Sequence, residues 1–215
     1  MPSPAPILIL NGPPRSGKTS IVEAVQDHAD RPWMNLGVDV YARHVTPLHW
    51  QPGIGLRPGE DHPELQALIP TLYAALYESI AAHSRLGLAV VADLGHHVAT
   101  PEGLSILKDC ARRVMGLPVL FVGVHAPIDI IMERRRAAAA EGGPYVTVAV
   151  AEPPPAPVVR WQEATQAPGL FDMEIDTSRT SAADAAELIA ERWLNPPPGP
   201  TAFERLAPDE GEDRR

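Results

Sequence analysis

Short apolar runs alternate with longer segments of helical periodicity along most of the chain. The runs are rich in Val, Ile and Leu and end at polar residues, as buried parallel strands do. They predict strands at Pro6–Asn11, Met34–Asp39, Leu88–Asp93, Val119–His125 and Leu170–Asp176. Between them, apolar positions recur at helical spacing and predict helices at Gly17–His28, Pro63–Leu86 and Thr100–Met115, one opened by Pro127, and a last one capped by Ser181. This alternation favours an α/β fold with helices covering a parallel sheet.

Three stretches break the pattern. His44–His62 is rich in proline and glycine. Gly142–Pro157 lacks periodicity, and we expect a mobile, lid-like excursion there. Pro196–Arg215 begins with three prolines and ends in mixed charge, which predicts a disordered tail. A chain of 215 residues fits one domain with an appendage better than two, so we expect one domain over residues 1–195.

The charge balance narrows the possible partners. The net charge is −9, which repels a nucleic-acid backbone and an anionic membrane surface. No apolar stretch approaches the roughly 20 residues of a membrane-spanning helix. Cys110 is the only cysteine, which excludes an internal disulfide and favours the reducing cytoplasm; in a helix interior we expect it to be packed. We therefore expect a cytoplasmic protein with neither nucleic-acid nor membrane partners, and a homo-oligomer stays open.

The first predicted strand leads into a phosphate-binding motif. Gly12–Thr19 fits G-x-x-x-x-G-K-[ST], lies after a buried strand and opens a helix, as a phosphate-cradling loop requires. Its glycines let backbone N–H groups point at phosphates, Lys18 neutralises β/γ charge, and the Thr19 hydroxyl binds Mg²⁺. Only two of the eighteen basic residues are lysines, and one is Lys18. We expect ATP or GTP to contact Gly12, Pro13, Pro14, Arg15, Ser16, Gly17, Lys18, Thr19 and Ser20; for Arg15 a surface role is equally possible.

Two aspartates end predicted strands, where a parallel sheet opens onto its ligand crevice. Asp39 could accept the proton of an acceptor hydroxyl, or it could merely cap a following helix; its position alone leaves both open. Asp93 follows Val90-Val91-Ala92, the pattern of a carboxylate that holds Mg²⁺ or its water in phosphate-loop proteins.

Arginines and histidines elsewhere add candidates. Arg134, Arg135 and Arg136 are consecutive on a predicted helix and point about 100° apart. One or two could stabilise the transferring phosphoryl group, with Arg134 and Arg135 slightly favoured, or all three could form a solvated basic face. His96 and His97 follow Asp93, but no further ligands at zinc spacing are evident, so a substrate-lining or surface role is favoured.

These motifs resemble chloramphenicol 3-O-phosphotransferases and their antibiotic-kinase relatives. The likeness runs through Ile7–Thr19, Trp33–Asp39, Pro47, His62–Leu65, Ala92-Asp93, Val122–Val124, Val159–Gln162 and Phe171–Thr177. The resemblance implies a three-layer sandwich around a five-stranded parallel sheet of the nucleotide- and shikimate-kinase type. It also implies that Asp39 is the general base, that lid arginines lie at 134–136, and that Thr177, Ser178 and Arg179 lie near the nucleotide base.

Two departures from the family pattern concern the acceptor. Leu94 follows Asp93 where the family often has a second acid, and the Gly142–Pro157 excursion is unusually long and proline-rich. The sequence predicts a small-molecule O-kinase. The resemblance implies that its acceptor is an antibiotic, either chloramphenicol-like or a capuramycin-type nucleoside, which phosphorylation would inactivate. The acceptor is expected between Asp39, Trp50, Asp93 and His96. The alternatives are a kinase for a metabolic alcohol or a nucleoside monophosphate, or a nucleotide-binding regulatory protein with little turnover.

Overall fold

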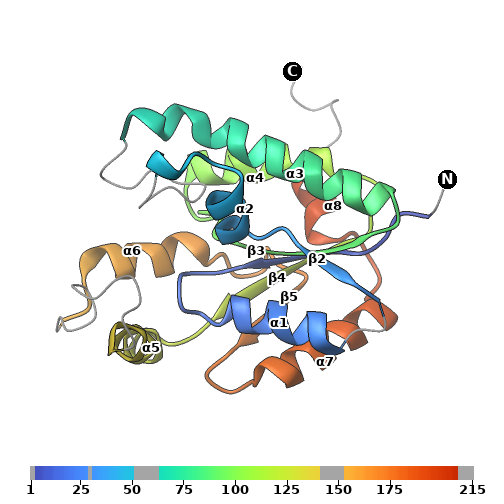
Figure 1. The fold of residues 1–215 in the computed structure, drawn as a ribbon. Helices are drawn as coiled ribbons and strands as arrows, with labels where there is room; N and C mark the ends of the chain where they lie inside the picture. Colours follow the sequence, from blue (N-terminus) through green and yellow to red (C-terminus); the bar gives the residue numbers. More distant parts are fainter. Residues whose placement is uncertain (1–2, 29–30, 51–62, 141–152, 208–215) are drawn as a thin grey trace.

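A five-stranded, fully parallel sheet forms the centre of the molecule (Figure 1). The computed structural model describes residues 3–28, 31–50, 63–140 and 153–207. The strand order is β2-β3-β1-β4-β5. The strands are β1 (Ile7–Asn11), β2 (Trp33–Asn35), β3 (Ala89–Leu94), β4 (Val119–His125) and β5 (Met173–Asp176). The α/β prediction is confirmed.

Helices cover both faces of this sheet. Alternate residues of β1 point to opposite sides, so Ile7 and Ile9 enter one core while Leu8 and Leu10 enter the other. The first core is closed by α3 (Ile69–Arg85), α4 (Pro101–Arg113) and α8 (Ala202–Leu206), and the second by α1 (Lys18–His28) and α7 (Ala182–Leu194) (Figure 1). Three layers result, as expected.

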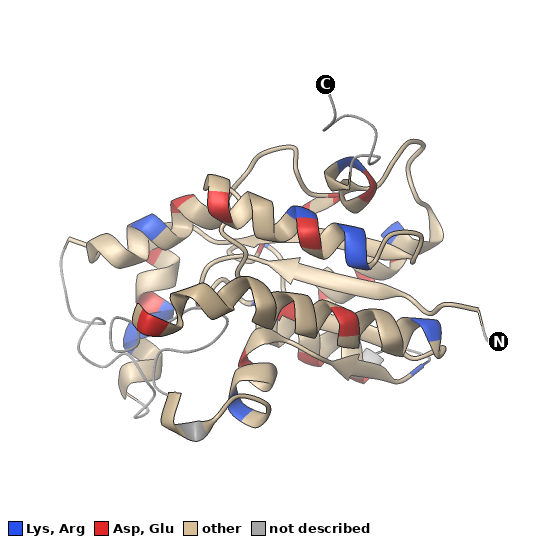
Figure 2. Ribbon diagram, turned by 90° about the horizontal axis from the view of Figure 1, so that it is seen from above, with Lys and Arg blue, Asp and Glu red and all other residues tan. Residues whose placement is uncertain are grey.

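Three shorter or peripheral helices lie around this framework. They are α2 (Val38–His44), α5 (Ile128–Ala140) and α6 (Ala156–Thr165), with 3₁₀ turns η1 (Leu48–Trp50) and η2 (Pro63–Leu68). Helices α5 and α6 lie at the end of the sheet where the strands finish (Figure 1). Acidic and basic positions are interspersed over the outer helices, while the central strand carries neither (Figure 2). Within the described residues, no helix combines the length and apolar character needed to cross a bilayer.

The second strand is shorter than its apolar pattern predicts. It ends at Asn35, whose side-chain oxygen accepts a hydrogen bond from the Gly37 N–H at 2.9 Å and so turns the chain. Helix α2 then begins at Val38, which places Asp39 in its first turn. The expectation that Asp39 ends a strand is therefore wrong, although Asp39 stays at the same edge of the sheet.

The C-terminal segment also differs from its prediction. Residues 196–207 contain α8, whose N-terminus is stabilised by a capping box between Thr201 and Glu204. Phe203 is 4% exposed, and its ring lies 5.1 Å from Phe121 and 6.2 Å from Tyr77, measured between centroids. This packing orders residues that their composition predicts as disordered, while 208–215 lie outside the described residues.

The predicted excursion at Gly142–Pro157 lies mostly outside the described residues. Its last part is described and leads into α6, for which Pro155 is the N-cap residue. Cys110 is fully buried in α4, as expected, and burial raises the pKa of its thiol.

Candidate active site

The motif Gly12–Thr19 forms a tight loop between β1 and α1. A Cβ at Gly12 would lie 2.0 Å from the Val124 carbonyl oxygen, so no larger residue fits. Gly17 has a φ of +99°, which favours glycine. Arg15 has a φ of +70°, an uncommon conformation for a residue with a side chain. The loop is therefore a close-packed turn whose residue types are set by its backbone shape.

The side chain of Lys18 folds back over this loop and bonds to its backbone. Its Nζ donates to the carbonyl oxygens of Gly12 at 2.8 Å and Pro13 at 2.9 Å. Helix α1 begins at Lys18, so the first N–H groups of the helix open toward the same place. An ammonium group and the N–H groups of a helix N-terminus together favour the binding of an anion.

Hydrogen bonds connect the outer side of the loop to α5 and to the segment after β5. Arg134 Nη1 donates to the Arg15 carbonyl oxygen at 3.1 Å and to Thr177 Oγ1 at 2.9 Å, while Nη2 donates to the Thr177 carbonyl oxygen at 2.9 Å. The Thr177 hydroxyl is 2.6 Å from the Ser16 carbonyl oxygen. The structure thus brings both predicted residues to the loop, on its carbonyl side.

Asp93 and Thr19 meet beside the loop. The Thr19 hydroxyl donates to Asp93 Oδ2 at 2.9 Å. Burial raises the pKa of Asp93; Lys18 and the Thr19 hydroxyl oppose the shift, and the nearby charge of Asp39 adds to it. The structure therefore brings four predicted residues, Lys18, Thr19, Asp39 and Asp93, into one electrostatic cluster.

Gly37 makes room for this cluster. A Cβ at Gly37 would lie 1.7 Å from Asp93 Oδ1. Its φ of −63° is open to any residue, so space rather than backbone conformation demands glycine here. Sequence reasoning missed this role because nothing local in the sequence shows which side chain faces residue 37.

His96 lies inside the protein, behind the site. It is 2% exposed, its Nε2 is 2.9 Å from the Tyr77 hydroxyl oxygen, and its ring stacks on Tyr73. Burial lowers the pKa of His96 to about 3, so the ring is neutral. Its backbone N–H donates to Asn11 Oδ1 at 2.6 Å. The structure thus gives His96 a supporting position in place of the substrate-lining one predicted.

The remaining candidates differ in their burial and their local contacts. Trp50 ends η1 with its ring against His49, and the segment that follows it lies outside the described residues. Arg135 is 6% exposed, and Arg136 donates to the Met132 carbonyl oxygen. Arg179 is exposed, 3.8 Å from Asp176. The predicted roles of Trp50, Arg135, Arg179 and Ser20 stay predictions.

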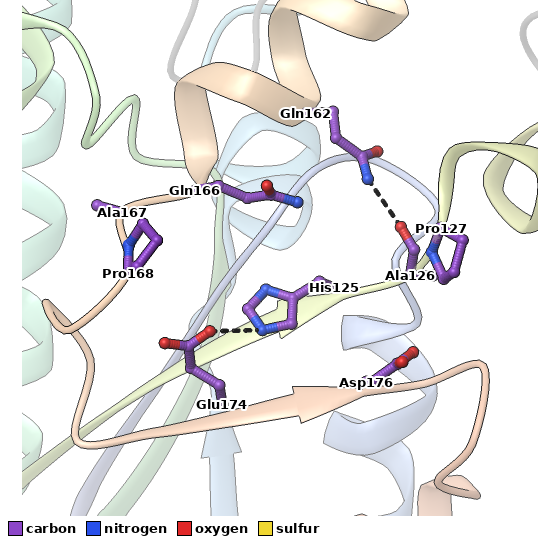
Figure 3. A pocket seen from close by; sticks show the side chains of 9 residues that line it. All are labelled: His125, Ala126, Pro127, Gln162, Gln166, Ala167, Pro168, Glu174 and Asp176. Carbon is purple, nitrogen blue, oxygen red and sulfur yellow. Dashed lines mark hydrogen bonds and ion pairs between the residues drawn. The ribbon is translucent and has the colours of Figure 1, made fainter.

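A separate cavity of about 310 Å³ lies beside the ends of β4 and β5 (Figure 3). His125 and Glu174 form an ion pair across it at 2.9 Å when the imidazole is protonated. Gln162 of α6 donates to the Ala126 carbonyl oxygen at 2.8 Å. On its far side, hydrogen bonds from Ser178 lower the pKa of Asp176. None of these side chains was predicted, because single polar residues at strand ends carry no distinctive spacing.

Comparisons with known proteins agree with this geometry. The family model described as chloramphenicol phosphotransferase-like protein matches residues 5–194. A Mycobacterium tuberculosis protein named "Putative O-phosphotransferase" is 28% identical, covering 93% of this chain and 87% of its own.

Two solved structures show the same fold. The M. tuberculosis APS kinase superposes with a TM-score of 0.57 at 13% identity, covering 90% of this chain and 99% of its own. The tunicamycin resistance protein of Deinococcus radiodurans superposes with a TM-score of 0.56 at 20% identity, covering 91% and 99%. Because the family model spans most of the chain, and the residues it spans include the phosphate loop and its acidic neighbours, this protein is a kinase of the chloramphenicol phosphotransferase-like family.

Proposed function

We propose that this kinase moves the γ-phosphoryl group of a purine nucleoside triphosphate, with Mg²⁺, to a hydroxyl group of an antibiotic. The observation that carries the proposal is the cluster of Lys18, Thr19, Asp39 and Asp93 around the phosphate loop. It combines an ammonium group that can bind the triphosphate with two carboxylates at the same edge of the sheet.

The oxygen atoms of Thr19 and Asp93 fit a magnesium ion. Mg²⁺ prefers hard oxygen ligands and is usually held by one or two protein groups together with phosphate oxygens. A hydroxyl and a carboxylate that already lie 2.9 Å apart beside the loop meet that requirement. The ion would supply charge neutralisation between the β- and γ-phosphates.

Lys18 is placed to hold the triphosphate. In this structure its ammonium group bonds to two carbonyl oxygens of the loop, at Gly12 and Pro13. Phosphate oxygens carry more negative charge than these carbonyls, so a bound triphosphate draws the ammonium toward itself. Charge spreads over the γ-phosphoryl oxygens during transfer, and the lysine then stabilises the transition state.

Asp39 is our candidate for the general base. Asp39 lies two residues after Gly37, which packs against the Asp93 carboxylate, and its charge acts on Asp93. In the proposed step, Asp39 accepts the proton of the acceptor hydroxyl, and the oxygen forms a bond to the γ-phosphorus. The bond from that phosphorus to the β-bridging oxygen breaks, and the nucleoside diphosphate leaves. Asp39 would return its proton to solvent.

The acceptor is the least constrained part of the proposal. The family description names chloramphenicol, and a protein of the same fold is named for tunicamycin resistance. Both support a hydroxylated antibiotic, of the chloramphenicol type or a capuramycin-type nucleoside, whose phosphorylation would give resistance. The mycobacterial relative is named only for O-linked transfer, which keeps a metabolic alcohol or a nucleoside monophosphate as the second candidate.

Mass spectrometry of a panel of candidate acceptors, incubated with enzyme, Mg²⁺ and either ATP or GTP, tests the proposal. One compound should gain a single phosphoryl group. Lys18→Ala should abolish the gain, whereas the control Lys108→Ala, on α4, should keep it. Equal transfer by both lysine variants, or no nucleotide binding by the parent, would refute the proposed chemistry.

The assignment of Asp39 needs its own control, since a first-turn aspartate also stabilises its helix. Asp129 occupies the first turn of α5 and serves as the matched position. We expect Asp39→Asn to keep nucleotide affinity and lose transfer by roughly a hundredfold or more. Asp129→Asn should retain transfer. If both variants lose the same small fraction of transfer activity, Asp39 only stabilises its helix and is not the general base.

A further inference from the structure

Two side chains hold consecutive carbonyl groups on the outside of the phosphate loop. Arg134 reaches the Arg15 carbonyl oxygen, and the Thr177 hydroxyl reaches the Ser16 carbonyl oxygen at 2.6 Å. Arg134 also holds Thr177 twice, through its Oγ1 and its carbonyl oxygen, both at 2.9 Å. We call these two residues, Arg134 and Thr177, the outer strap.

The outer strap acts on peptide groups that face the phosphates on their other side. In a trans peptide the C=O and the following N–H point in opposite directions. The Ser16 carbonyl is held by Thr177, so the N–H of Gly17 points away from the strap. A hydrogen bond to the carbonyl also polarises the peptide group, which makes its N–H a better donor. The strap therefore both orients and strengthens a phosphate-facing donor.

The same two residues stabilise the unusual backbone of the loop. Arg15 has a φ of +70°, and its carbonyl oxygen is held by Arg134. Gly17 has a φ of +99°, and a Cβ there would lie 3.1 to 3.3 Å from three atoms of the Thr177 side chain. Thr177 thus covers Gly17 closely. Strained conformations persist only where their surroundings fix them, and here α5 and the segment after β5 do so.

We propose that Arg134 and Thr177 are positioning residues that hold the phosphate loop in its anion-binding shape from outside, touching neither the phosphates nor the base. The proposal rests on the function proposed above. It replaces two expectations from the sequence, a phosphate-reaching Arg134 and a base-contacting Thr177. The reason is that the guanidinium and the hydroxyl are already engaged with carbonyl oxygens on the far side of the loop.

Inorganic tripolyphosphate, which has no base, separates positioning from base contact. Its affinity and that of ATP are measured by calorimetry with Mg²⁺ for the parent and for Thr177→Val, which removes the hydroxyl while nearly keeping the shape. Valine removes the hydroxyl's bonds to the carbonyl oxygens of Ser16 and His125 and the bond that it accepts from Arg134. Both probes should therefore bind more weakly by the same factor, roughly tenfold. Thr177→Ser, which keeps the hydroxyl, should restore both. Ser181→Ala, whose hydroxyl bonds to Asp184 at the start of α7, is the control and should bind like the parent.

Two results with Thr177→Val would contradict the role proposed for the outer strap. If Thr177→Val weakens ATP alone, Thr177 contacts the base; if it weakens neither probe, the hydroxyl holds nothing that binding needs. If the parent binds neither probe, the proposed function fails instead.

Arg134→Lys is a second, independent test of the outer strap. It also serves if Thr177→Val does not fold. Lysine keeps the charge but cannot make the forked contacts of a guanidinium. We expect tripolyphosphate to bind roughly tenfold more weakly and the KM for nucleotide to rise by a similar factor. Unchanged binding with a steep fall in kcat would instead show that Arg134 acts on the transition state.

Discussion

Asn11 joins three segments that surround the phosphate loop, and its replacement by alanine is the sharpest test of how the site is supported. It is the last residue of β1 and is fully buried. Its Oδ1 accepts from the His96 N–H at 2.6 Å, and its Nδ2 donates to the carbonyl oxygens of His96 at 3.2 Å and Thr165 at 3.4 Å. One side chain therefore connects β1, the segment after β3 and the end of α6.

The cost of Asn11→Ala follows from these bonds. The short bond to the His96 N–H is the strongest, and leaving that donor unpaired in the interior costs about 1–3 kcal/mol. The two long bonds contribute less, and the lost side-chain volume adds roughly 1 kcal/mol. We expect a total of about 3 kcal/mol. At about 2–4 °C per kcal/mol for a chain of this size, the melting temperature should fall by roughly 10 °C.

Urea unfolding of Asn11→Ala beside Asn195→Ala measures this difference. Asn195 is exposed at the end of α7, and its side chain makes one long bond, 3.4 Å, to the Glu191 carbonyl oxygen. The control should change the free energy of unfolding by less than about 0.5 kcal/mol. If the two variants lose equal stability, the Asn11 amide does not hold the three segments together.

Three further predictions concern the cluster and the C-terminal helix. Asp93→Asn should melt above the parent at pH 7 without Mg²⁺, because burial disfavours the charged form of Asp93. The raised pKa of Asp93 stabilises the folded parent fully below about pH 4, and this stabilisation is lost as pH rises through the folded-state value. Calorimetry should therefore show the difference between the two melting temperatures narrowing as the pH falls toward about 4. Gly37→Ala must displace the Asp93 carboxylate from Thr19, so the Mg²⁺ concentration for half-maximal rate should rise roughly tenfold. Phe203→Ala should cost about 3–5 kcal/mol in urea unfolding, and Phe203→Leu far less.

The sheet was predictable where burial alone decides. Val119–Val124 is a continuous run without polar side chains, Pro127 follows three positions later, and β4 has the predicted bounds. At β2 the pattern failed because Leu36 and Val38 are apolar for different reasons, and the Asn35–Gly37 turn separates strand from helix. Apolar residues show that a segment is buried, but turn chemistry decides where its backbone changes direction.

Helices α6 and α8 were missed because each follows prolines and is too short to show a clear helical period. Phe203 and Leu206 gain their partners from α3 and β4, far away in the sequence. A short helix is not stable by propensity alone, so its existence depends on such tertiary contacts. Local pattern cannot supply that information.

The site divides in the same way. The sequence could single out Gly12 to Thr19 and Asp93 as candidates because phosphate and metal chemistry demand fixed residue types beside a strand. Arg134 and Thr177 were also candidates, but their positioning role was not predicted, because Thr177 and Ser16 lie 161 positions apart and a Thr–carbonyl contact leaves no pattern in the sequence. Asn11 and Gly37 were missed for the same reason.

Electrostatics ties the acceptor side of the site to the nucleotide side. Burial disfavours the charged form of Asp93, the neighbouring charge of Asp39 disfavours it further, and Lys18 with the Thr19 hydroxyl offsets this only in part. A cation held by Asp93 and Thr19 would remove the repulsion between the two carboxylates. Asp39 would then face a positive centre, which lowers the cost of keeping it ionised and ready to accept a proton. Under the proposed function, the nucleotide and its metal would relieve this unfavourable arrangement of charge, and their binding would then stabilise that edge of the sheet.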